Sequence, residues 1–76
     1  MTFCNALTAT VNYIPGTGRC QFATEIVIML GTVIVATRTV GGRYSQTQAL
    51  DEFKRNARLF QRGDGFDAAK QLKLVA

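Results

Sequence analysis

Histidine is absent from the 76 residues of this chain, and cysteine occurs only twice. The missing imidazole removes the usual general base, the usual nitrogen ligand of zinc, and every Ser-His or Cys-His catalytic arrangement. Two cysteines alone do not make a convincing metal site. The sequence therefore predicts a protein that is not an enzyme and that needs no metal or other cofactor.

The two cysteines are predicted to be free thiols. Cys4 and Cys20 open the first two strands of an expected antiparallel hairpin, so they should lie at its opposite ends. A disulfide requires Cα atoms within about 7 Å of each other. Free thiols agree with a reducing compartment.

The chain also lacks an apolar segment long enough to cross a membrane. The apolar run from Ile26 to Ala36 covers eleven residues, whereas a membrane-spanning helix needs roughly 20. The N-terminal stretch MTFCNALTATVNY has no basic segment before an apolar core and no cleavage site of small residues. We expect a cytoplasmic protein with no membrane segment.

Length and composition predict one small globular domain over residues 1–76. With 47% hydrophobic and 18% charged residues, the chain has enough apolar material to fold. Nine basic residues against five acidic ones give a net charge of +4. This charge favours an anionic partner, either nucleic acid or an acidic protein surface.

The apolar run is expected to fold back on itself as a hairpin. It is rich in β-branched residues, which favour strands, and Gly31-Thr32 at its centre suits a two-residue turn of type II′. The expected strands are Cys20 to Leu30 and Val33 to Val40. This register places four pairs opposite each other: Leu30 with Val33, Ile28 with Val35, Glu25 with Arg38, and Thr24 with Thr39.

A first strand is predicted over Asn5 to Tyr13, where apolar and polar residues alternate, and the turn segment IPGTGR follows it. In SQTQ, Ser45 and Gln48 match a capping box. Apolar residues then recur at helical spacing as far as Phe60, and Gly63 is a natural C-terminal stop for the helix. We expect a helix over Gln46 to Arg62. The tail is predicted to end in a strand over Gln71 to Val75, the alternative being a short helix capped by Asp67. The fold class is α+β: a three-stranded antiparallel meander, one amphipathic helix and a short C-terminal strand.

Both faces of the central hairpin are predicted to be apolar, and one helix can cover only one of them. The helix should cover the face that contains Phe22, Ile26, Ile28, Leu30, Val33 and Val35. The other face is a candidate interface for self-association or for a partner; in the alternative, the N- or C-terminal segment folds over it. Its residues are Val27, Met29, Ile34, Ala36 and Val40.

Basic residues form a stripe on the expected helix and just before it, on the side away from its aromatic residues. Such a stripe can contact phosphates or an acidic protein surface. The alternative is an ordinary solvated face, partly neutralised by pairs of Arg55 with Asp51 and Glu52. No aromatic platform is apparent beside the stripe, so sequence-specific reading of bases is not expected. Its residues are Arg43, Lys54, Arg55, Arg58 and Arg62.

The order of two hairpins, the capped helix GGRYSQTQALDEFKRNARLF and a short terminal segment resembles small phage-encoded anti-CRISPR proteins, in size and element order across the whole chain. The resemblance implies a stoichiometric inhibitor of a host protein or nucleoprotein defence complex. It carries over no site residues, because no motif is shared. We therefore expect a binding protein whose target is another protein. The alternatives are a non-specific nucleic-acid binder and a structural homo-oligomer such as a homodimer.

Overall fold

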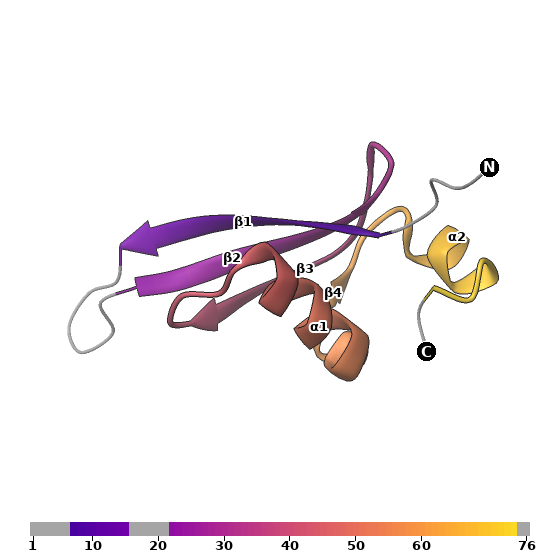
Figure 1. Ribbon diagram of the computed structural model, residues 1–76. Coiled ribbons are helices and arrows are strands. Elements are labelled where there is room, and N and C mark those ends of the chain that lie inside the picture. Colours follow the sequence, from indigo (N-terminus) through magenta and orange to yellow (C-terminus); the bar gives the residue numbers. More distant parts are fainter. Residues whose placement is uncertain (1–6, 16–21, 75–76) are drawn as a thin grey trace.

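The computed structural model describes residues 7–15 and 22–74 of the chain. Their elements follow the order β-β-β-α-η-β-α, where η is a short 3-10 helix (Figure 1). None of the helices in these residues is long and apolar enough to span a membrane. The elements are β1 (Thr8–Pro15), β2 (Phe22–Leu30), β3 (Val33–Gly41), α1 (Gln46–Asn56), η1 (Ala57–Leu59), β4 (Gln61–Arg62) and α2 (Phe66–Gln71).

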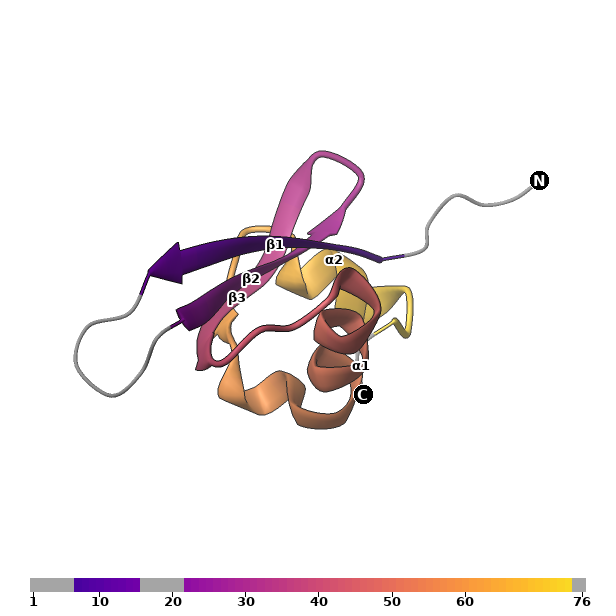
Figure 2. The same ribbon diagram turned by 60° about the vertical axis from the view of Figure 1, so that its left-hand side comes forward.

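The four strands form one antiparallel sheet in the order β1-β2-β3-β4. Helix α1 lies along one face of this sheet, which we call the inner face, and contacts β1 and β2 (Figures 1 and 2). The expected α+β class is confirmed, since a three-stranded meander is followed by a helix and a short strand. Cys4 and Cys20, on which the prediction of free thiols rests, lie outside the described residues.

The short strand occurs earlier in the chain than expected. Gln61 and Arg62 pair with Thr37 and Ala36 of β3, and the tail forms helix α2 instead of a strand. Phe66 and Ala69, three residues apart, are both buried, which is the spacing of one helical face. The alternation that suggested a strand over Gln71 to Val75 was misleading, because Gln71 still belongs to α2 and a turn follows it.

Helix α1 begins where the sequence predicted and ends earlier. The backbone N–H of Gln48 donates to Ser45 Oγ at 3.2 Å, and the Ser45 N–H donates to Gln48 Oε1 at 2.9 Å, so the capping box is confirmed. The expected end at Arg62 is wrong: α1 stops at Asn56 and η1 follows. Phe60 then adopts an extended backbone, which lets its ring meet Phe53 edge to face at 5.1 Å between centroids.

A β-bulge in β3 changes the register of the central hairpin. The pair Leu30–Val33 beside the turn is as predicted, and Gly31 has the positive φ, 63°, that a primed hairpin turn requires. Beyond Met29–Ile34, however, Val35 is an extra residue, so Ile28 faces Ala36 instead. The predicted pairs further along the strands are shifted by one residue, because Thr24 faces Val40, Glu25 faces Thr39, and Arg38 faces Ile26.

The core lies between the inner face, α1 and α2. Phe53 of α1 is fully buried, as are Ile26 and Ile28 of β2. Thr24 is buried among these apolar residues, and its hydroxyl donates to the carbonyl of Gly42 at 2.7 Å and accepts from the N–H of Tyr44 at 3.1 Å. One buried side chain therefore fixes the segment that leads from β3 into α1.

Replacing Thr24 by valine is expected to lower the free energy of unfolding by about 1–3 kcal/mol, because two polar backbone groups lose their partner. Urea denaturation measures the change. Thr39→Val is the matched control: Thr39 is exposed, and its replacement should change stability by no more than about 0.5 kcal/mol. Equal effects of the two substitutions would contradict a structural role for the Thr24 hydroxyl.

Candidate nucleic-acid interface

Three of the five predicted basic site residues gather around one hollow. Lys54, Arg55 and Arg58, with Ala57 between them, line a shallow pocket of about 270 Å³. All three cationic side chains are exposed. We call this hollow the basic pocket.

The pocket forms where α1 passes into η1. Lys54 and Arg55 lie in the last turn of α1, and Arg58 follows in η1. The C-terminal end of a helix carries a partial negative charge, which favours cations there. Arg55 Nε also contacts Asp51 Oδ2 at 3.2 Å, as predicted, but the two side chains are 74% and 58% exposed. Because this pair is so exposed, Arg55 remains able to bind a more highly charged anion.

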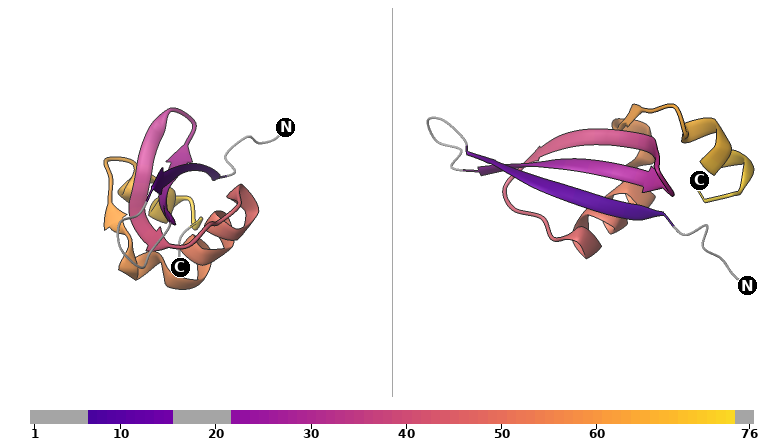
Figure 3. Two further views of the ribbon diagram at one scale, coloured as in Figure 1. Left: turned by 90° about the vertical axis from the view of Figure 1, so that its left-hand side faces the viewer. Right: turned by 90° about the horizontal axis from the view of Figure 1, so that it is seen from above.

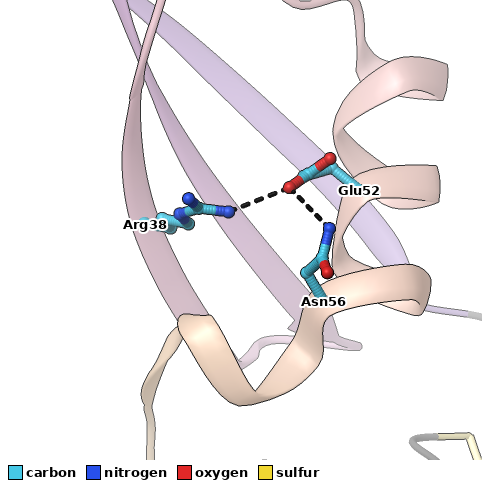
Figure 4. A network of polar contacts seen from close by, with 3 residues as sticks. All are labelled: Arg38, Glu52 and Asn56. Carbon is cyan, nitrogen blue, oxygen red and sulfur yellow. Dashed lines mark hydrogen bonds and ion pairs between the residues drawn. The ribbon is translucent and has the colours of Figure 1, made fainter.

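Glu52 does not neutralise the pocket, contrary to the expected Glu52–Arg55 pair. Its Oε2 accepts a 2.9 Å ion-paired hydrogen bond from Arg38 Nη1 and a 3.0 Å hydrogen bond from Asn56 Nδ2 (Figure 4). The predicted Glu25–Arg38 pair is likewise wrong, because the bulge turns Arg38 toward α1. There its guanidinium lies 5.7 Å from the centroid of the Phe60 ring.

The other two predicted cations lie away from the pocket, each against aromatic rings. The Arg62 guanidinium lies 4.6 Å from the Phe66 ring centroid. The Arg43 guanidinium lies 4.6 Å from the ring centroid of Phe22 and 5.3 Å from that of Tyr13. Tyr13 and Phe22 were not predicted from the sequence as partners of Arg43. The available signal was that Tyr13 ends the first predicted strand and Phe22 lies near the start of the second.

The bulge divides the second group of predicted site residues, the candidate interface on one face of the sheet. Val27, Met29 and Ile34 remain on the outer face of the sheet, away from α1, where Met29 and Ile34 pair directly. Ala36 is fully buried instead, and Val40 packs against the core. These two were wrongly placed because the extra residue Val35 reverses the faces that follow it. The outer apolar patch is therefore smaller than expected, and Thr37 and Thr39 lie beside it.

The arrangement is suited to holding an anion. The pocket brings three cationic groups together, and guanidinium groups match phosphate oxygens in geometry. Within residues 7–15 and 22–74, no group of three or more His, Cys, Asp or Glu side chains is placed to hold a metal ion.

Comparison with known proteins identifies no relative: no protein-family model, no curated protein and no solved structure gives a significant match to this chain.

The Arg38–Glu52 pair is expected to stabilise the fold more than the Asp51–Arg55 pair. Its side chains are only 28% and 22% exposed, so a double-mutant cycle with Arg38→Met and Glu52→Gln should give a coupling energy near 1 kcal/mol. The matched cycle with Asp51→Asn and Arg55→Met should give about 0.3–0.5 kcal/mol, the value typical of exposed pairs one helical turn apart. Urea unfolding of all the variants measures both. Similar coupling in the two cycles would contradict the difference in burial.

Proposed function

We propose that the protein is a non-enzymatic nucleic-acid-binding module that contacts the phosphate backbone through the basic pocket. The observation that carries this proposal is the convergence of Lys54, Arg55 and Arg58 on one hollow. Binding of this kind depends on neutralising phosphates and releasing counterions, so it does not select a base sequence.

The charges around the pocket support a polyanionic ligand. Among the described residues, Asp51 is paired with Arg55, and Glu52 is turned toward Arg38. In the same part of the chain, neither Lys54 nor Arg58 forms an ion pair. A phosphate at the pocket would therefore meet cations that the fold does not already use.

Two further features favour nucleic acid over an acidic protein surface. The apolar outer face, which would have supported a protein interface, retains only three of its five predicted residues. In addition, Arg43 and Arg62 lie on aromatic rings, and arginine combined with aromatic rings is typical of surfaces that bind single strands.

The double variant Arg55→Glu/Arg58→Glu is expected to abolish binding of a labelled oligonucleotide of about twelve thymidines, measured by fluorescence anisotropy. In single variants to alanine, the slope of log affinity against log salt should become shallower by about 0.7 for each lost phosphate contact. The control is Lys70→Glu/Lys73→Glu, which makes the same change of charge at two other exposed positions. Equal losses in the two double variants would show that net charge, not the pocket, determines binding.

A protein partner is the second candidate, favoured by the contiguous outer residues Val27, Met29 and Ile34. Ile34 is 43% exposed and directly faces Met29 across the strands. In this form of the proposal, the protein is a stoichiometric inhibitor of a host protein or nucleoprotein complex, as the resemblance to anti-CRISPR proteins implies. The outer patch would supply the apolar centre of the interface, and the cations its rim.

For this second candidate, the immobilised protein is expected to retain a protein complex from nuclease-treated bacterial lysate. The variant Val27→Thr/Ile34→Thr should lose it, because the apolar contacts disappear while the β-branched side chains preserve the strands. Leu59→Ser, at another exposed apolar residue, serves as the control. A capture that disappears with nuclease would exclude the protein partner and support nucleic acid as the ligand.

A further inference from the structure

One end of the sheet, formed by β1 and β2, projects beyond α1 (Figure 3). Two exposed aromatic side chains, Tyr13 and Phe22, share the inner face at this end. Tyr13 pairs with Thr24, whose side chain points into the core, and Phe22 precedes Thr24 by two residues. All three side chains therefore lie on one face. Tyr13 is 48% exposed and Phe22 is 40% exposed, although aromatic rings gain free energy from burial.

Arg43 joins these two rings into one surface. Its guanidinium lies 5.3 Å from the Tyr13 ring centroid and 4.6 Å from that of Phe22, so a planar cation contacts both π systems. We call Tyr13, Phe22 and Arg43 the aromatic platform.

The fold holds the platform in place. The Tyr13 hydroxyl donates to the carbonyl of Tyr44 at 2.9 Å. The Thr24 hydroxyl fixes the residues on both sides of Arg43 through its bonds with Gly42 and Tyr44. The backbone that carries Arg43 is therefore anchored to β1 and β2, and little further ordering would be needed when a ligand binds.

The charge around the platform is suited to an anionic ligand. The carboxylate nearest in sequence to Phe22 is that of Glu25. It faces Asn12 and Thr39 on the outer face and accepts a hydrogen bond from Asn12. It therefore lies on the far side of the sheet from Arg43. A ligand that combines a flat ring with a negative charge would stack on the platform and be attracted by its guanidinium.

From these contacts we infer that the aromatic platform stacks unpaired bases of single-stranded nucleic acid, an inference that rests on the proposed function. Stacking accepts every base, because each has a π face, so it agrees with binding that does not depend on sequence. The platform and the basic pocket lie toward opposite ends of α1, which is about 16 Å long at 1.5 Å per residue. A strand of about twelve nucleotides can reach both, even at the 3.4 Å spacing of stacked bases.

The test compares two labelled single strands of equal length and charge, one of twelve thymidines and one of twelve abasic sugar-phosphate units. Both should bind through the basic pocket. The abasic strand has no base that could stack on the platform. Because even one stacked base is worth about fivefold or more in affinity, the thymidine strand should bind at least about fivefold more tightly.

Phe22→Leu is expected to remove most of that preference while leaving affinity for the abasic strand unchanged, because leucine is apolar but offers no π face. Ile14→Ala is the matched control, since Ile14 adjoins Tyr13, is 41% exposed and lies on the outer face. It should leave the preference as it is.

A direct signal comes from tyrosine fluorescence. The chain has two tyrosines and no tryptophan, so Tyr44→Phe leaves Tyr13 as the only strong emitter. Thymidine strands should quench this emission, and abasic strands should not.

Equal affinity for the two strands, or a preference for thymidine that survives Phe22→Leu, would contradict base stacking on the platform but not the proposed function. Failure of the wild-type protein to bind either strand would overturn both.

Discussion

The extra residue in β3 determines how the two layers of this protein meet. Val35 and Ala36 are both fully buried, which two successive residues of a regular strand cannot achieve on one face. After the bulge, Thr37 and Thr39 turn outward, while Arg38 and Val40 turn toward α1. The bulge thus places an apolar residue and a cation on the inner face in place of two threonines. The cation is stabilised there because it pairs with Glu52 and lies over the Phe60 ring.

The same bulge shapes the connection after α1. Gly63 donates its N–H to the Val35 carbonyl at 2.7 Å, and a Cβ at Gly63 would approach the Ile34 carbonyl oxygen to 2.5 Å. Only glycine lets β4 and the following residues lie so close to β3. Since the chain must reach β3 at Gln61, α1 has to end well before Arg62. The early end of α1 places Lys54, Arg55 and Arg58 around one hollow instead of along a longer stripe.

Local patterns were sufficient to predict the meander, the turn at Gly31, the capping box at Ser45 and the overall class. Each depends on neighbouring residues, whose propensities act without knowledge of the rest of the fold. The bulge was not predictable in this way. The regular register offered Glu25–Arg38 and Thr24–Thr39 pairs that looked favourable, and only the burial of both Val35 and Ala36 by tertiary packing outweighs them. Gly63 was expected to stop the helix, whereas it permits close approach to β3, a role that depends on a residue 29 positions away in sequence.

Most of the candidate site was predicted as residue types, but not as an arrangement. The five cations were identified from their charge and from their places on or just before the expected helix. Neither reveals that Arg43 lies on two rings or that Arg55 and Arg58 share a pocket. Because helix α1 lies between these two places, its length fixes their separation. A ligand that engages both must be long, flexible and anionic, with flat groups along it. Single-stranded nucleic acid has all four properties, whereas a rigid acidic protein surface would have to match the distance and offer a flat side chain at the platform.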